Sequence, residues 1–184
     1  RDSRSIVEAV DGSLRRLRTD YIDIFQTHWP DPTIPVEETI GALEILRDSG
    51  KIRYFGVSNY SYGDMRSAHD ASRGDIVSNQ VEYNLVERGI EQEILPYAQS
   101  HDIVLMAYNP LFQDGAPSET LDSIGRKYEI TRSQTILNWL CSHKNVVPIP
   151  RTLSLDHLRQ NSKAAEIEFD EIDVNNIDAA YQTN

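Results

Sequence analysis

The amino-acid sequence predicts an α/β fold built around a parallel β-sheet. Five short segments rich in β-branched, aromatic and aliphatic residues alternate with segments whose apolar residues recur at helical spacing. The strand segments start near residues 21, 52, 77, 103 and 146, which leaves room for a helix in each connection. Such crossovers are right-handed and join parallel strands. Polar residues with ligand-binding chemistry follow the strand segments, at the edge where parallel sheets bind ligands.

The first two helix and strand pairs are predicted by residue periodicity. Ile6 and Val10 share one helix face, and arginines end this helix, where positive charge complements the helix dipole. The segment 21–27 is rich in β-branched and aromatic residues, which predicts a strand. A helix of about fourteen residues is expected from Val36, and a strand over 52–57 follows it.

The later elements are predicted by capping residues and by apolar spacing. Ser61, Thr131 and Ser154 precede apolar-periodic segments and are expected to cap helices, with Thr131 and Gln134 forming a capping box. Further helices are expected near residues 90–98, near 121–128 and, weakly, after 169. The three remaining strands are expected over 76–82, 103–108 and 146–149.

Composition indicates one soluble domain over residues 1–184, because 39% of the residues are apolar and no Pro/Gly/Ser-rich linker divides the chain. The net charge of -11 argues against nucleic acid or an anionic membrane as partner. No apolar run approaches the ~20 residues that span a bilayer, and no secretion signal is recognisable, so we expect a cytoplasmic protein. Cys141 is the only cysteine, and no Cys/His spacing fits a metal site.

Five parallel strands fit either an open doubly wound sheet or part of a (β/α)8 barrel, and periodicity leaves both open. A complete barrel needs ~250 residues, so a barrel of this length would lack about three of its eight strands. The sequence begins at Arg1 inside an expected helix, and we expect an N-terminally truncated domain. Its two unpaired sheet edges would then be open to another chain.

The polar residues at the ends of the expected strands are the candidate ligand-binding groups. They are His28, Ser58, Asn59, Gln80, Tyr108, Asn109, Arg151 and Thr152. The cation of Arg151 and the Ser154 cap combine positive charge with free helix N–H groups, as a phosphate site does. Structural alternatives remain open: His28 as a hydrogen-bonded structural histidine, Asn59 as a turn residue, and Tyr108 as part of the core. No glycine-rich dinucleotide or nucleotide fingerprint follows any strand.

Five strings in the sequence carry a family resemblance. They are DYIDIFQTHWP from Asp20, GVSNY from Gly56, NQVEYN from Asn79, AYNPL from Ala107 and IPRT from Ile149. In this order they resemble the later part of an aldo-keto reductase, over essentially the whole chain. The resemblance implies a (β/α)8 TIM barrel, of which this chain supplies the fourth to eighth strands.

The resemblance also implies a function, the NADP-dependent reduction of aldehydes or ketones to alcohols by hydride transfer. His28 matches the histidine beside the substrate carbonyl. The positions that match cofactor-binding residues are Ser58, Asn59 and Gln80 for the nicotinamide carboxamide, Tyr108 for its ring, Asn109 and Leu111 for the pyrophosphate, Arg151, Thr152 and Ser154 for the 2'-phosphate, and Gln160 and Asn161 for adenine. His157 stands where many members have an arginine, so NAD remains an alternative to NADP(H).

The family's catalytic tyrosine, lysine and aspartate come from the first three strands, and this chain contains no match to them. We therefore expect negligible reductase activity from the chain alone, and a complementary fragment or a homo-oligomer as its partner besides a small carbonyl substrate. The alternative function is a non-catalytic nicotinamide-binding interaction module, similar to potassium-channel β subunits, which the Val81 to Leu85 string resembles.

Overall fold

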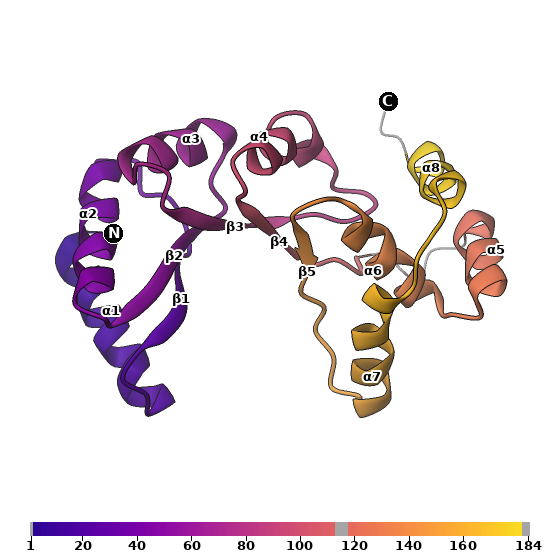
Figure 1. The fold of residues 1–184 in the computed structure, drawn as a ribbon, viewed down its shortest axis with the longest axis horizontal. Helices are drawn as coiled ribbons and strands as arrows, with labels where there is room; N and C mark the ends of the chain where they lie inside the picture. Colours follow the sequence, from indigo (N-terminus) through magenta and orange to yellow (C-terminus); the bar gives the residue numbers. More distant parts are fainter. Residues whose placement is uncertain (1, 113–117, 182–184) are drawn as a thin grey trace. The chain divides into compact units, whose positions relative to one another are not determined.

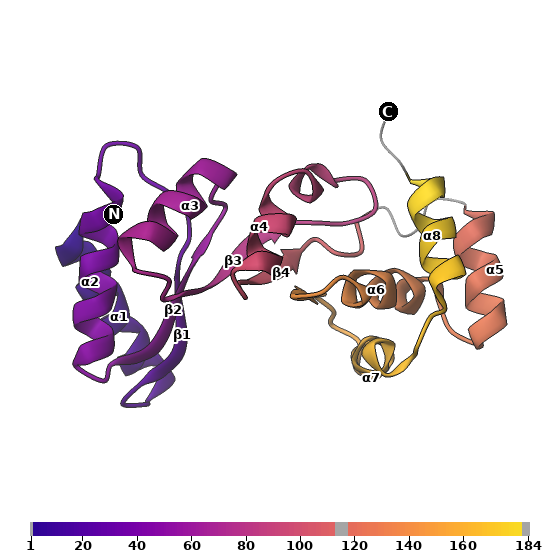
Figure 2. The ribbon, with the colours of Figure 1, turned by 45° about the horizontal axis from the view of Figure 1, so that its top comes forward.

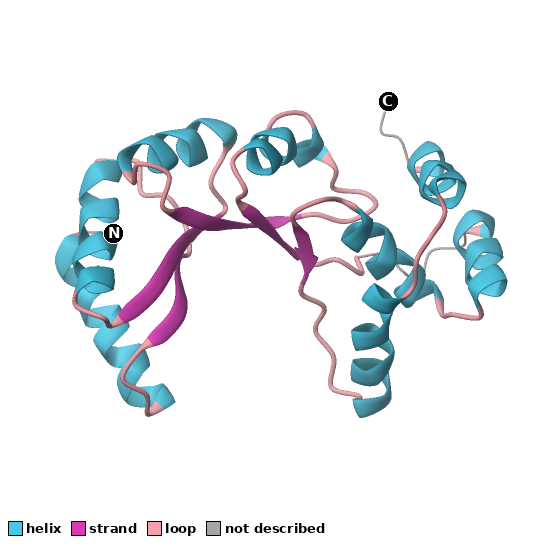
Figure 3. Cartoon of the chain, in the orientation of Figure 1, coloured by secondary structure: helices cyan, strands magenta, loops and turns pink. Residues whose placement is uncertain are grey.

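The computed structural model describes residues 2–112 and 118–181, in which helices and strands alternate along the chain (Figure 1; Figure 3). The strands are β1 (Ile22–Thr27), β2 (Ile52–Ser58), β3 (Ile76–Glu82), β4 (Val104–Tyr108) and β5 (Val146–Pro148). The α-helices are α1 (Ser3–Leu17), α2 (Val36–Asp48), α3 (Tyr62–Ala71), α4 (Ile94–Ser100), α5 (Glu119–Tyr128), α6 (Arg132–Ser142), α7 (Leu155–Lys163) and α8 (Glu171–Ala180). Two 3₁₀ turns cover Gly89–Glu91 and Ala164–Glu166.

The sheet confirms the predicted α/β class. Its strand order, β1-β2-β3-β4-β5, equals the order of the strands in the sequence. The pairs β1·β2, β2·β3 and β4·β5 are parallel. Neighbouring parallel strands require crossover connections, and helices supply them, as the spacing of the strand segments predicts.

Two compact units make up the chain, and each is described by itself. The first unit comprises Arg1–Val81 and Pro96–Val104, and the second comprises Glu82–Leu95 and Leu105–Asn184. The expected single domain over residues 1–184 stays a prediction.

In the first unit, α1 and α2 lie side by side along one face of β1 and β2 (Figures 1 and 2). Phe55 and Val57 of β2 point into this core and are fully buried. Ile24 and Tyr54, paired across β1 and β2, are 46% and 55% exposed. Parallel strands normally bury both faces, so the exposed face of β1 and β2 is a surface suited to burial against further polypeptide.

In the second unit, α6 is the central element and contacts α5, α7, α8 and β5. Its residues Ile136 to Leu140 are all buried, and Trp139 is the largest of them. The indole Nε1 of Trp139 donates a 3.0 Å hydrogen bond to Asp178 of α8. By contrast, α7 has no buried residue, and its Leu155 and Leu158 are 70% and 55% exposed.

The capping residues confirm three predicted helix starts. The side chains of Ser61, Thr131 and Ser154 each accept a hydrogen bond from the backbone N–H of the residue three positions later in the helix. The predicted Thr131 and Gln134 capping box is present. One expectation was wrong: residues 90–98 do not form one helix, but a 3₁₀ turn followed by α4. Pro96 sits in the first turn of α4, and because it has no N–H and a fixed φ it favours a helix that begins just before it.

Among the described residues, no helix combines the length and the apolar character that crossing a membrane requires.

Candidate active site

Asn59 joins the carboxyl ends of three strands in the first unit. Its side-chain amide donates hydrogen bonds to the backbone oxygen of His28 (3.0 Å) and to Ser58 Oγ (3.2 Å). Its backbone N–H donates a 2.8 Å bond to the Gln80 oxygen. Asn59 has a φ of 60°, a left-handed conformation that asparagine tolerates better than most residues. The structure therefore brings His28, Ser58, Asn59 and Gln80 together, as the strand-end pattern predicts.

The Gln80 side chain is held by a second glutamine. Its Nε2 donates a 3.2 Å hydrogen bond to Gln26 Oε1, and Gln26 Nε2 donates to Ser78 Oγ at 2.9 Å. No described residue donates to Gln80 Oε1, so this oxygen of a half-buried side chain can accept a hydrogen bond from a ligand. Gln26 was not among the predicted site residues, although the two-residue period of β1 puts Gln26 and His28 on the same face of the strand.

The imidazole of His28 is exposed at the end of β1, beside the ring of Trp29. Behind it, Tyr60 is 4% exposed and accepts a 3.5 Å hydrogen bond from Thr27. Burial is the main cause that raises the pKa of Tyr60. The His28 ring is thus exposed, and the neighbouring Thr27 is hydrogen-bonded to a buried phenol.

The second unit has a hollow of about 390 Å³ at the ends of β4 and β5. Four of the predicted cofactor-binding residues line it: Tyr108, Asn109, Leu111 and Arg151. Asn109 has a φ of 50° and donates a 3.0 Å hydrogen bond to Glu82. Burial, and then the charge of Glu82, raise the pKa of the Tyr108 phenol, which stays neutral near pH 7. The hollow therefore combines an aromatic ring, an apolar side chain and an exposed guanidinium.

Thr152 and Ser154 shape the turn that leads into α7. Thr152 Oγ1 accepts a 3.1 Å hydrogen bond from the Ser154 backbone N–H, and Ser154 Oγ caps the N–H of His157 at 3.3 Å. Gln160 and Asn161 lie further along α7, where Gln160 is exposed and Asn161 half-buried. Neither residue lines the hollow at Tyr108. Thr152 and Ser154 therefore lie together at the start of α7. Gln160 and Asn161 lie further along this helix, apart from that start.

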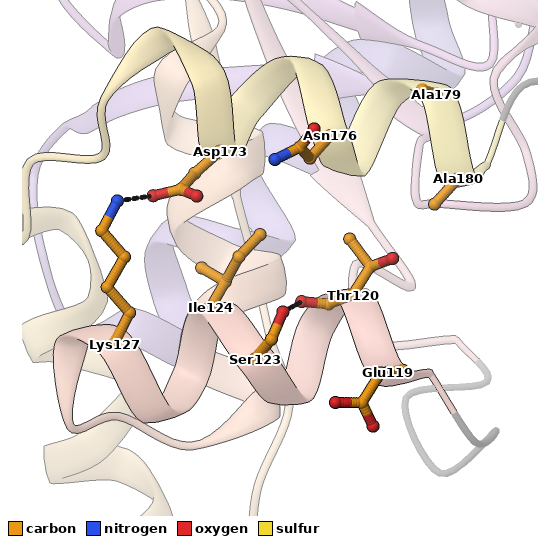
Figure 4. A pocket seen from close by; sticks show the side chains of 9 residues that line it. All are labelled: Glu119, Thr120, Ser123, Ile124, Lys127, Asp173, Asn176, Ala179 and Ala180. Carbon is orange, nitrogen blue, oxygen red and sulfur yellow. Dashed lines mark hydrogen bonds and ion pairs between the residues drawn. The ribbon is translucent and has the colours of Figure 1, made fainter.

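A larger hollow of about 620 Å³ lies between α5 and α8 (Figure 4). Its cation, Lys127, forms ion pairs with Asp173 (2.6 Å) and Asp170 (2.7 Å), which raise the pKa of the lysine. The Ser123 hydroxyl donates to the Thr120 backbone oxygen at 2.9 Å. Because these polar groups are satisfied within the protein and no predicted site residue lines the hollow, we do not consider it the active site.

A model of the aldo/keto reductase family matches residues 2–182. The chain belongs to this family. Methylglyoxal reductase YeaE of Escherichia coli (strain K12) is 37% identical to it over 182 residues, which cover 95% of this chain and 64% of that protein. The chain therefore spans less than two thirds of the length of this curated aldo-keto reductase.

Solved aldo-keto reductases share the fold. The thermostable enzyme Tm1743, in complex with the inhibitor epalrestat, aligns with a TM-score of 0.91 and 37% identity, over 97% of this chain and 66% of its own. An aldo/keto reductase from Klebsiella pneumoniae, in complex with NADP and acetate, aligns with a TM-score of 0.86 and 36% identity, over 96% of this chain and 64% of its own. These likenesses confirm the predicted fold class, part of a (β/α)8 barrel with five strands, and the predicted family.

Proposed function

We propose that this chain supplies the cofactor-binding part of an NADP-dependent aldehyde or ketone reductase. The observation that carries the proposal is the hydrogen-bonded group of His28, Ser58, Asn59 and Gln80 at the ends of adjacent parallel strands. Ligands of parallel α/β proteins bind at this edge. Family membership and the NADP in the Klebsiella pneumoniae relative support the same assignment.

The residues present fit a nicotinamide cofactor chemically. A carboxamide offers one acceptor and two N–H donors, and Gln80 Oε1 is an acceptor that receives no hydrogen bond from the described residues. The Tyr108 ring provides a flat surface for stacking, and Arg151 provides a cation for phosphate. From the family resemblance, we propose a role in cofactor binding for each of these two groups.

Arg151, Thr152 and Ser154 support a preference for NADP over NAD. A guanidinium beside hydroxyl groups at a helix start is suited to a phosphate monoester. His157 is exposed in the first turn of α7, where the family often has an arginine. Histidine lacks the bidentate fork and the permanent charge of a guanidinium, so NAD remains an alternative cofactor.

Hydride transfer to a carbonyl carbon is the chemistry that the reduced nicotinamide supplies when bound. His28 is exposed at the strand end, and we propose that its imidazole orients and polarises the carbonyl oxygen. The proton donor, a tyrosine tuned by a lysine and an aspartate, has no match in these 184 residues. Loss of a positioned general acid costs about 10²- to 10⁴-fold in rate, so we propose that this chain alone has negligible activity.

Two exposed surfaces support a complementary polypeptide as partner. In the first unit, the side chains of Ile24 and Tyr54 are exposed on the uncovered face of β1 and β2. In the second unit, the side chains of Leu155 and Leu158 are exposed on α7. Exposed apolar patches of this kind mark interaction surfaces. We propose that the complementary polypeptide covers them and supplies the proton donor, with a second copy of this chain as the alternative.

Calorimetric titration with NADP⁺ and NAD⁺ tests the cofactor assignment. We expect NADP⁺ to bind, and Arg151→Met to weaken NADP⁺ by about tenfold while NAD⁺ changes less than about twofold. Arg4→Met removes an exposed arginine of the first unit and serves as the matched control. Absence of binding of either cofactor, or an equal loss for both in Arg151→Met, contradicts the assignment.

NADPH oxidation with methylglyoxal, the substrate in the name of the Escherichia coli relative, tests the reductase assignment. We expect no turnover from this chain alone, and turnover when the N-terminal part of that relative is fused to it. Turnover by the chain alone contradicts the proposed need for a complement. Cofactor binding without turnover in the folded fusion contradicts the reductase assignment and favours the non-catalytic binding module.

A further inference from the structure

A separate hollow of about 440 Å³ lies in the first unit, outside the hydrogen-bonded group at the strand ends. The loop over residues 30–35, the start of α2 and the first turns of α3 form its walls. Its volume falls in the range of small-molecule sites, about 300–1,000 Å³. The cofactor assignment above makes no use of it.

The lining of this hollow is apolar on one side. Pro30, Pro32, Ile34 and Val36 contribute ring and branched aliphatic carbon from the loop and from α2. Tyr60, which is 4% exposed, adds a buried aromatic ring. Three prolines in the loop, at positions 30, 32 and 35, limit its backbone freedom, so this wall is preorganised. Binding of an apolar group here therefore costs little ordering entropy.

Two carboxylates also line the hollow, Asp31 from the loop and Asp64 from α3. Asp31 Oδ1 accepts hydrogen bonds from the Thr33 hydroxyl (2.6 Å) and the Thr33 N–H (3.0 Å), and these bonds lower the pKa of the aspartate. Asp64 Oδ2 accepts from the Ser61 hydroxyl (2.6 Å) and the Ser61 N–H (3.3 Å). The second oxygen of each carboxylate has no donor among the described residues.

The negative charge of the two carboxylates is not balanced by a basic side chain in the described lining of the hollow. Of the described residues that line it, none is lysine, arginine or histidine. Asp64 is close enough to Tyr60 for its charge to contribute to the raised pKa of that phenol. An occupant with a cationic group for the carboxylates and an apolar body for the prolines matches the polar and the apolar parts of the lining.

We propose that this hollow is a second binding site, for a small ammonium compound with an apolar body. The ammonium N–H groups donate to Asp31 Oδ2 and Asp64 Oδ1, and the apolar body packs on Pro30, Pro32 and Tyr60. Because Pro30 follows His28 by two residues and Tyr60 follows Asn59 directly, occupancy changes the surroundings of both residues. The site is therefore positioned to modulate the strand-end group.

Amide chemical-shift titration of the full chain with benzylamine at pH 7 tests the proposal, and benzyl alcohol is the neutral probe of nearly equal shape. We expect benzylamine to shift the amides of Asp31, Thr33, Ile34 and Val36 and those of residues 60–67. We expect the alcohol to bind the same residues about fivefold more weakly, because it lacks the charge. Equal affinities, or shifts confined to other residues, overturn the proposal.

The double variant Asp31→Asn/Asp64→Asn removes both charges and keeps an acceptor oxygen for the turn and for the cap. We expect its benzylamine affinity to fall to within about twofold of the alcohol, while its alcohol affinity stays unchanged. The matched control is Asp48→Asn, which removes a 72% exposed carboxylate at the other end of α2 and is expected to leave both affinities unchanged. An unchanged benzylamine affinity in the double variant overturns the proposal. If the double variant does not fold, the comparison of the two probes on the unaltered chain decides.

Discussion

The side-chain amide of Asn59 donates a 3.0 Å hydrogen bond to the backbone oxygen of His28, which ties the end of β2 to the end of β1. The same residue reaches β3 through its backbone N–H and adopts a φ of 60°. Asn59 thus has two separable roles at the strand ends, a left-handed backbone and a hydrogen-bonding amide.

Substitutions of Asn59 separate these two roles. Asn59→Ala loses the amide bond and strains the backbone, and we expect a loss of about 2 kcal/mol in the free energy of unfolding. Asn59→Gly relieves the backbone strain, and we expect a loss of about 1 kcal/mol. Urea unfolding measures both values. Equal losses in the two variants would show that the positive φ carries no cost.

Gly56 lies against Ser78 in the neighbouring strand. A Cβ at position 56 would overlap with Ser78 Oγ and would stand 2.7 Å from the Ser78 backbone oxygen. We expect Gly56→Ala to cost about 1–3 kcal/mol in the free energy of unfolding, because backbone has to move. Gly41→Ala is the matched control: nothing lies within 4 Å of its Cβ in helix α2, and we expect it to stabilise by about 0.5–1 kcal/mol. A neutral Gly56→Ala contradicts the close approach of β2 and β3.

Arg88 links two carboxylates in the second unit. It forms ion pairs of 2.8 Å with Glu91 and with Asp178, and its side chain is 9% exposed. We expect Arg88→Met to cost about 3 kcal/mol, because it leaves two partly buried carboxylates without their cation. Arg4→Met removes the 90% exposed partner of Glu8, and we expect a change below about 0.5 kcal/mol. Thermal unfolding of both variants measures the difference, and similar losses contradict the buried network.

The lowered pKa of His69 indicates that the stability of the fold depends on pH. Its Nδ1 lies 3.0 Å from the Tyr97 hydroxyl, and its ring centroid is 5.0 Å from that of His101. Burial, and then the charge of His101, lower the pKa of His69 below 6.5, against the opposing charge of Asp70. The neutral imidazole is therefore favoured in the folded state, and its stabilisation is present above about pH 6.5 and lost as pH falls through the lowered pKa.

His69→Gln tests this dependence. The variant keeps a hydrogen-bonding side chain but has no proton to gain at this position. We expect its free energy of unfolding to fall less steeply between pH 7 and pH 5 than that of the unaltered chain. The measurement is urea unfolding at a series of pH values. Parallel pH profiles of the two proteins would contradict the role of His69.

The grouping of His28, Asn59 and Gln80 could be predicted from sequence, because the carboxyl ends of parallel strands meet at one edge. The hydrogen bond between Gln26 and Gln80 could not, since it depends on register. Phe55 pairs with Ile76 but Val57 pairs with Asn79, so the strands shift by one residue between these pairs. No periodicity in either strand indicates such an irregularity.

Contacts between helices could not be predicted from the sequence either. His69 and His101 were assigned no role, although their rings pack against Tyr97 at the contact of α3 with the segment after α4. Helix periodicity gives the face of each helix but not which residues of two faces meet. The roles of the eleven proposed cofactor-binding residues stay predictions, because the family resemblance identifies the positions and only a bound cofactor tests them.

The most direct test of the central claim is an amide chemical-shift titration of the full chain with NADP⁺. We expect the amides of His28, Asn59 and Gln80 to shift, because the hydrogen-bonded group at the strand ends of the first unit contacts the cofactor. No shifts at these three residues, or shifts confined to residues elsewhere in the chain, would contradict the claim that these strand ends bind the cofactor.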